Sequence, residues 1–146
     1  MKIIIKNLQK KLPVSPTRIK KAALNLLSRS GKYSCRIKKP GEITICLVSD
    51  TRIRELNLLY LGDGRATDVI AFDTSADKQE LVADIAISTD AAMRNARAFK
   101  TTPASEVYRY VIHGLLHILG YDDNNKRNQA IMRKKEEYFL NMLAHS

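Results

Sequence analysis

The 146-residue sequence predicts a single α+β domain in which a small mixed sheet of about four strands is flanked by helices. Short runs rich in β-branched residues predict strands, and segments with helical spacing of apolar residues lie between and after them. With 45% hydrophobic residues, a chain of this length can bury one substantial core. No repeat or low-complexity stretch divides residues 1–146, so we expect them to form one domain.

The first predicted strand, Lys2–Lys6, precedes an amphipathic helix from Pro16 to about Arg29. Ser15 suits the N-cap of this helix and Pro16 its first position, while Ser30 and Gly31 are expected to end it. The apolar residues expected to face inward are Ile19, Ala23, Leu24 and Leu27.

The middle of the chain alternates strands and helices. Glu42–Val48 predicts a strand, and Asp50 is the expected N-cap of a helix that runs to about Leu61. Two further apolar strands are expected at Val69–Phe72 and Val82–Ile87, followed by a helix at Asp90–Phe99.

The next helix is apolar on most sides, which predicts that it runs through the core. Thr102 suits its N-cap, Pro103 its first turn, and Glu106 the positive end of its dipole. Two apolar stripes leave one strip that carries Tyr110, His113 and His117. The stripes consist of Val107, Val111, Leu115 and Ile118, and of Ile112, Leu116 and Leu119.

A final helix is predicted from Lys126 to Met142. We expect it to pack on the core through Ile131, Tyr138, Phe139 and Met142. Its mixed charges are typical of a solvated face; these residues are Arg133, Lys134, Lys135, Glu136 and Glu137.

His113 and His117 are four residues apart, so both imidazoles project from one face of the core helix and can reach one metal ion. Gly120 can adopt a left-handed conformation, end the helix and return Asp123 to the same ion. Three protein ligands and an open position for water indicate a catalytic zinc site. His145 lies next to the C-terminus and is left out of this site.

The same spacing occurs in metzincin peptidases, which carry a glutamate directly after the first histidine as the general base. Gly114 occupies that position here and cannot move a proton. The stretch instead resembles the signature of the YbeY family of bacterial endoribonucleases, His-Gly-x-Leu-His-x-x-Gly-Tyr-Asp-His. The matching residues are His113, Gly114, Leu116, His117, Gly120, Tyr121 and Asp122.

The third metal position of that signature is a histidine, and this chain has Asp123 there. A carboxylate binds zinc and also makes the site more hospitable to other divalent, oxygen-preferring metals. Asp122 is the competing ligand, but it aligns with an aspartate of the signature that is not a ligand, so we favour Asp123.

Residues 56–72 resemble a second YbeY block, Leu-Asn-x-x-Tyr-Arg-x-x-x-x-Pro-Thr-Asp-Val-Leu-Ser-Phe, and residues 83–88 resemble Gly-Asp-Ile-x-Ile-Ser. Leu61 stands where the family has an arginine associated with catalysis or RNA contact. Arg65, four residues later, is the candidate to replace that arginine and bind phosphate. The matches in the second block are Asn57, Tyr60, Thr67, Asp68, Val69 and Phe72.

The resemblance implies a metal-dependent, single-strand-specific endoribonuclease that acts in maturation of the 16S rRNA 3′ end and in ribosome quality control. Its implied partners are RNA and the ribosome or a small-subunit precursor. A non-catalytic ribosome-binding factor stabilised by the metal is the main alternative, because Leu61 and Asp123 both depart from the family pattern. A metallopeptidase is the weaker alternative, since Asp68 or Asp84 would have to replace the missing base.

Charge is concentrated at the N-terminus. Residues 1–41 contain twelve lysines and arginines and no acidic residue, whereas the whole chain has a net charge of +10. Uncompensated positive charge favours a polyanionic partner such as RNA. Lys20, Lys21 and Arg29, on the exposed side of the first helix, are the candidate RNA-binding residues.

The sequence contains no apolar run long enough to span a membrane, and its first residues do not resemble a secretory signal. Cys35 and Cys46 lack a metal-binding spacing, and we expect both to stay reduced in the cytoplasm. The alternative is a single disulfide between them. The sequence does not predict an oligomeric state.

Overall fold

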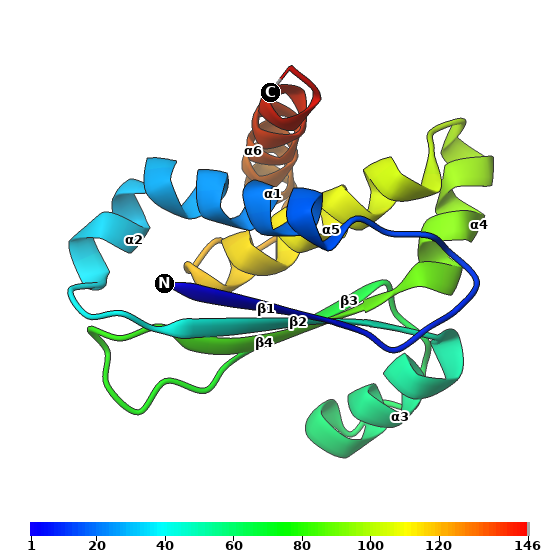
Figure 1. The fold of residues 1–146 in the computed structure, drawn as a ribbon, viewed down its shortest axis with the longest axis horizontal. Helices are drawn as coiled ribbons and strands as arrows, with labels where there is room; N and C mark the ends of the chain where they lie inside the picture. The colour runs from blue at the N-terminus through cyan, green and yellow to red at the C-terminus, as the bar shows by residue number, and fades with distance from the viewer. Residues whose placement is uncertain (146) are drawn as a thin grey trace.

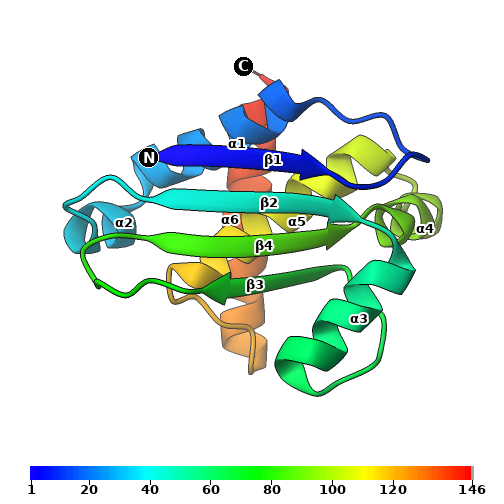
Figure 2. The ribbon, with the colours of Figure 1, turned by 60° about the horizontal axis from the view of Figure 1, so that its bottom comes forward.

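The computed structural model describes residues 1–145. Its four strands are β1 (Lys2–Asn7), β2 (Glu42–Val48), β3 (Val69–Asp73) and β4 (Val82–Ser88). They form one sheet in the order β1-β2-β4-β3, as Figure 2 shows. β1 and β4 run parallel to β2, and β3 pairs antiparallel with β4. The predicted mixed four-stranded sheet and α+β class are confirmed.

The structure contains six helices within the described residues. They are α1 (Pro16–Arg29), α2 (Gly31–Arg36), α3 (Asp50–Leu61), α4 (Thr89–Phe99), α5 (Pro103–Ile118) and α6 (Lys126–Ala144). α1, α5 and α6 lie over one face of the sheet, and α3 lies on the opposite face (Figure 1). None of the helices in residues 1–145 has the length and apolarity needed to cross a bilayer.

The main core lies between the sheet and α5. Ile45, Leu47, Ile85 and Ile87 of the sheet and Leu115 of α5 are fully buried in it. Both apolar stripes predicted for α5 are buried, which confirms that this helix runs through the core. α5 therefore provides a rigid carrier for the side chains on its remaining strip.

One local prediction is wrong, and one short helix, α2, was not predicted. Ser30 ends α1 but also caps the short helix α2, because its hydroxyl accepts a hydrogen bond from the Tyr33 backbone N–H at 3.2 Å. Ser49, not Asp50, caps α3 by accepting from the Arg52 backbone N–H at 3.3 Å. Asp50 instead accepts a hydrogen bond from the Ser88 hydroxyl at 2.7 Å and pairs with Arg94, which ties α3 to α4.

Three residues predicted to face inward are exposed. Leu24 of α1 is 44% exposed, and Ile131 and Tyr138 of α6 are 39% and 52% exposed. The buried positions of α6 are Met132, Glu136, Phe139 and Leu143, so its packed face is rotated from the predicted one. The predicted burial of Phe139 is confirmed, and Met142 is partly buried against the core.

Candidate metal centre

α5 approaches the sheet closely at Gly114. A Cβ atom on this glycine would lie 3.1 Å from Ile85 Cγ2 and 3.3 Å from Val69 Cγ2. Gly114 thus faces the sheet, and the absence of a side chain lets the helix approach β3 and β4. Gly114, which stands where a peptidase signature has glutamate, therefore allows α5 to pack closely against the sheet.

The turn after α5 forms as the sequence predicts. Gly120 has a φ of +99°, which is the left-handed region that glycine tolerates. Its backbone N–H donates to the His117 carbonyl, and that of Tyr121 donates to the Leu116 carbonyl, both at 3.0 Å. These bonds satisfy carbonyls at the helix end and reverse the chain, so that Asp123 returns to the side of α5 that carries the histidines.

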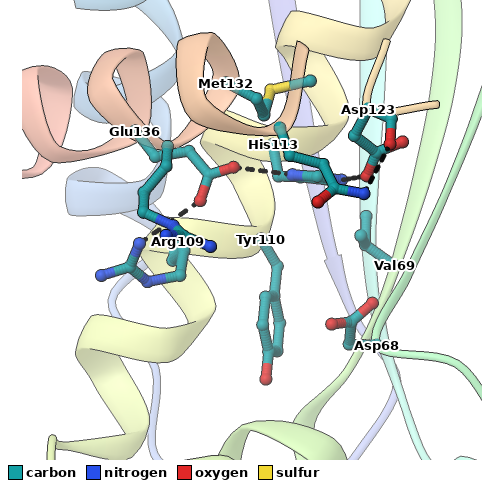
Figure 3. A pocket seen from close by; sticks show the side chains of 10 residues that line it. Asp68, Val69, Arg109, Tyr110, His113, Asp123, Met132 and Glu136 are labelled. Carbon is teal, nitrogen blue, oxygen red and sulfur yellow. Dashed lines mark hydrogen bonds and ion pairs between the residues drawn. The ribbon is translucent and has the colours of Figure 1, made fainter. Parts of the chain in front are cut away.

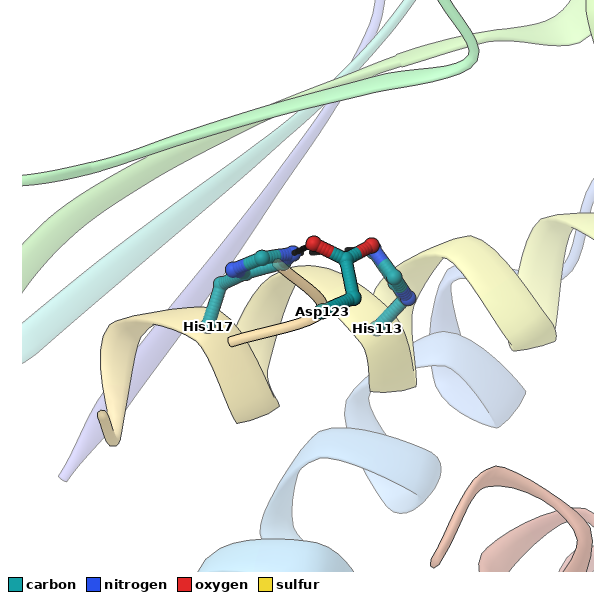
Figure 4. A group of neighbouring side chains, drawn as sticks. All are labelled: His113, His117 and Asp123. Atoms are coloured by element: carbon teal, nitrogen blue, oxygen red, sulfur yellow. Dashed lines mark hydrogen bonds and ion pairs between the residues drawn. The ribbon is translucent and has the colours of Figure 1, made fainter. Parts of the chain in front are cut away.

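His113, His117 and Asp123 converge at this turn (Figure 4). The two Nε2 atoms are 3.0 Å apart; Asp123 Oδ2 lies 3.8 Å from His113 Nε2, and Oδ1 lies 3.7 Å from His117 Nε2. One donor atom from each residue lies within 4.8 Å of the others. Two imidazoles and one carboxylate on a partly exposed surface fit a divalent metal ion with room for a further ligand.

Asp122 has a different role. Its carboxylate accepts hydrogen bonds from Asn128 Nδ2 at 2.6 Å and from the Asn124 backbone N–H at 3.4 Å. These contacts hold the loop that leads into α6. Asp123, rather than Asp122, lies with the two histidines.

Glu136 of α6 orients the first histidine, as Figure 3 shows. It is only 8% exposed, and its Oε2 lies 2.7 Å from His113 Nδ1. Its Oε1 accepts a hydrogen bond from Arg109 Nη1 at 3.3 Å, while Arg109 Nη2 donates to Glu137 at 2.9 Å. A carboxylate that accepts a hydrogen bond from Nδ1–H keeps the proton on Nδ1, which leaves the Nε2 lone pair free to bind a metal.

This buried position of Glu136 differs from the prediction, which places Glu136 on a solvated face. A signal was present, because Glu136 follows Met132 by four residues and precedes Phe139 by three. These three residues share one face of a helix. An acidic residue in register with buried apolar residues requires a buried polar partner, and His113 is that partner.

The two imidazoles have different electrostatic environments. Burial lowers the pKa of His113, but the hydrogen bond and charge of Glu136, with Asp123 and Asp68, outweigh burial and raise it above its usual value. Burial and the neighbouring His113 lower the pKa of His117, and the nearby carboxylates do not compensate. His117 is therefore the more readily deprotonated of the two, as a metal ligand must be.

Two hollows flank His113. One of about 300 Å³ is lined by Arg109, Gln129 and Arg133 among others, and one of about 530 Å³ reaches Leu61 and Thr67. Asp68, Val69, His113 and Asp123 line both hollows. Among the described residues, Asp68 and Asp123 are the two carboxylates that line both hollows. Leu61, which departs from the sequence block that this stretch resembles, lines the larger hollow.

Asp84 lies on the other face of the sheet. It alternates along β4 with Ile85, which faces Gly114 of α5. Neighbouring residues of a strand point to opposite faces, so the Asp84 carboxylate points away from the histidines.

Arg65 lies beside these hollows rather than in them. It lines a neighbouring cavity of about 330 Å³, which shares Leu61, Thr67, Val69 and Ile70 with the larger hollow. Its guanidinium pairs with Asp63 at 2.7 Å, and its side chain is 86% exposed. A phosphate that binds Arg65 would have to share the guanidinium with Asp63.

The candidate RNA-binding residues Lys20, Lys21 and Arg29 gather in a groove between α1 and the end of α6. Leu24 and His145 also line this groove. His145 is therefore separate from the three converging side chains that could hold a metal ion.

Comparison with known proteins agrees with these features. A family model described as Endoribonuclease YbeY matches residues 4–144. An endoribonuclease YbeY of Syntrophus aciditrophicus is 38% identical over 149 residues, covering 96% of this chain and 89% of that protein. Another, from a strain of Anaeromyxobacter, is 40% identical over 118 residues, covering 79% of this chain and 62% of that protein.

A solution structure from Thermotoga maritima superposes with a TM-score of 0.59 and 26% sequence identity. The match covers 97% of this chain and 88% of that one. The family match includes α5, the turn at Gly120 and α6, and so contains all three side chains that could hold a metal ion. The chain therefore belongs to the endoribonuclease YbeY family.

Proposed function

We propose that this protein is a metal-dependent endoribonuclease that cleaves single-stranded RNA and acts in maturation of the 16S rRNA 3′ end and in ribosome quality control. The observation that carries the proposal is the convergence of His113, His117 and Asp123 at the end of α5 in a chain of this family. RNA is the substrate class that the name of the related proteins indicates.

Zinc is the metal that we propose, with one ion per chain held by His113, His117 and Asp123. Two neutral imidazoles and a carboxylate are a common zinc donor set, and the carboxylate also allows other divalent metals. A bound ion would activate a nucleophile and stabilise negative charge on the phosphate.

The protein's own residues position the ligands and handle protons and phosphates. Glu136 holds His113 through Nδ1, so its Nε2 faces the other two donors. Asp68 faces both hollows beside His113 and is the candidate to accept a proton, a role that Gly114 cannot fill. Arg65 is the candidate phosphate contact at the edge of the larger hollow.

The proposed partners are RNA and the ribosome or a small-subunit precursor, in the cytoplasm. The surplus of basic residues in the first 41 positions supports an RNA partner. Lys20, Lys21 and Arg29 are the proposed RNA-binding residues outside the metal centre.

A non-catalytic ribosome-binding factor is the second candidate. It is favoured by Leu61, which places an apolar side chain at the hollow where the family has an arginine. A peptidase is disfavoured because Gly114 packs against the sheet and Asp84 points away from the histidines, leaving Asp68 as the candidate base.

The test compares cleavage of a structured RNA that has single-stranded segments, a fully paired RNA and casein, each with and without a chelator. We expect cleavage of single-stranded segments that the chelator abolishes and that His117→Ala lacks. Cleavage of casein would support a peptidase. Tight ribosome binding by a zinc-loaded protein that cleaves neither substrate would support the non-catalytic alternative.

A further inference from the structure

The groove between α1 and the end of α6 is the largest of the hollows described above. Its volume is about 940 Å³, compared with about 530 Å³ for the larger hollow beside His113. Its lining combines basic, neutral polar and apolar side chains and contains no acidic residue. The lining residues are Thr17, Lys20, Lys21, Leu24, Asn25, Ser28, Arg29, Met142 and His145.

The cations of this α1–α6 groove are not neutralised within the described residues. Lys20 and Lys21 are exposed and make no salt bridge in residues 1–145, and Arg29 donates only to the neutral Asn25 side chain, at 3.0 Å. Like charges held together repel one another unless an anion binds between them. The charge of the groove therefore fits a polyanion.

An apolar stripe that is exposed except at the partly buried Met142 continues from the groove along α6. Ile131, Lys135, Tyr138 and Met142 lie on one face of the helix, because successive members are three or four residues apart. Tyr138 is 52% exposed and Ile131 is 39% exposed, and Leu24 of α1 adds a side chain that is 44% exposed. A flat aromatic ring and aliphatic groups among lysines offer surfaces on which unpaired bases can stack.

The other end of the stripe reaches the loop that carries Asp123. Lys135 Nζ lies 4.9 Å from the centre of the Tyr121 ring, and Lys32 Nζ lies 4.0 Å from it. Tyr121 is two residues before Asp123. From Met142 back to Lys135, α6 covers about 10 Å, so a strand lying along this face would connect the groove with the metal loop.

We propose that the α1–α6 groove and the exposed stripe of α6 bind the single-stranded RNA segment that flanks the cleavage point. Lys20 and Lys21 bind phosphates, Leu24 and Tyr138 contact unpaired bases, and the lysines beside Tyr121 guide the strand to the metal loop. The inference rests on the proposed endoribonuclease function and adds the route of the substrate. A paired strand buries its base faces, so this surface also gives a reason for single-strand preference.

The first test measures binding of a fluorescein-labelled 2′-O-methyl oligouridine of roughly twelve nucleotides to the metal-loaded protein, by anisotropy over a series of salt concentrations. Lys20→Glu with Lys21→Glu is expected to weaken binding about tenfold or more and to reduce the salt slope by about 0.7 for each lost phosphate contact. The matched control, Arg97→Glu with Lys100→Glu, changes net charge equally on exposed residues of α4 and its C-cap. Equal losses in the two double variants would overturn the proposal.

The second test concerns base contact. Tyr138→Ala is expected to weaken binding of the single strand about fivefold or more, with little change for a duplex of the same length. Phe99→Ala is the control, since Phe99 is 69% exposed and lies at the end of α4, outside the groove and stripe. If Tyr138→Ala binds the single strand as tightly as Phe99→Ala does, the base-contacting role is wrong.

The outcome separates this inference from the proposed function. If the groove variants lose RNA binding but the wild type cleaves no RNA, the binding surface is supported and the proposed nuclease function is contradicted. If the wild type cleaves RNA and the groove variants bind RNA as tightly as the wild type does, the proposed binding surface is contradicted and the proposed nuclease function is not. Circular dichroism and metal content that match the wild type establish that each variant is folded.

Discussion

Asp123 contributes the carboxylate to the three side chains that converge after α5, and its position depends on the turn at Gly120. An anionic ligand reduces the positive charge of a bound ion more than a neutral imidazole does. The identity of this single residue therefore affects both metal affinity and the acidity of water at the site.

Asp123→Ala is expected to weaken zinc binding by more than the roughly 10–100-fold typical of losing a group that orients a ligand, because it removes a donor atom itself. Asp122→Ala is the matched control, since its carboxylate bonds to Asn124 and Asn128 instead. Zinc affinity is measured by competition with a chromophoric chelator. Unchanged affinity in Asp123→Ala would remove Asp123 from the site.

Glu136→Gln is expected to weaken zinc binding about tenfold, because a neutral amide holds the Nδ1 proton of His113 less strongly than a carboxylate does. Glu137→Gln removes the same charge one residue later and also loses a bond to Arg109, but it does not touch His113. We expect Glu137→Gln to bind zinc like the wild type. Equal affinities for the two variants would show that Glu136 does not position the ligand.

At the scale of the element, the position of α5 against the sheet fixes both histidines. Gly114 allows the close approach, with Ile85 and Val69 side chains in contact distance of any added Cβ atom. A larger residue would push the helix away from β3 and β4. Such a shift would move His113 and His117 relative to the loop that carries Asp123.

Gly114→Val is expected to destabilise the protein by about 1–3 kcal/mol through overpacking and to weaken zinc binding as well. Gly31→Val is the control, because a Cβ at Gly31 meets no atom within 4 Å. Urea denaturation measures the free energy of unfolding. A Gly114→Val protein as stable as the Gly31→Val control would contradict the packing role of Gly114.

The sequence predicts most elements well because their signals are local. Caps such as Ser15 and Thr102 and the glycine turn at Gly120 follow from residue type alone. The packed face of α6 depends instead on where α5 lies. The spacing of apolar residues predicts Tyr138 inward and Glu136 outward, whereas in the structure Tyr138 is exposed and Glu136 is buried. Local spacing of apolar residues does not decide between two possible faces when a buried ion pair supplies part of the contact.

At the scale of the whole molecule, α1, α5 and α6 lie over one face of the sheet (Figures 1 and 2). The candidate metal site lies at the end of α5, and residues of β3 line the larger hollow beside it. The antiparallel pairing of β3 with β4 brings Asp68 and Val69 next to His113. The strand order β1-β2-β4-β3 was not predictable from single strands, because pairing depends on contacts distant in sequence. The function class is predicted from the resemblance to a known family. The contact between Glu136 and His113 and the α1–α6 groove become visible only in the structure.

The central claim is that RNA cleavage depends on one metal ion held by His113, His117 and Asp123. It is tested most directly by stripping the protein with a chelator, adding zinc back in steps, and measuring the initial rate of cleavage of single-stranded RNA against zinc bound per chain. We predict a rate that rises in proportion to occupancy and levels off at one ion per chain, with no binding and no cleavage by His117→Ala. Full cleavage by the stripped protein, or by His117→Ala, would contradict the claim.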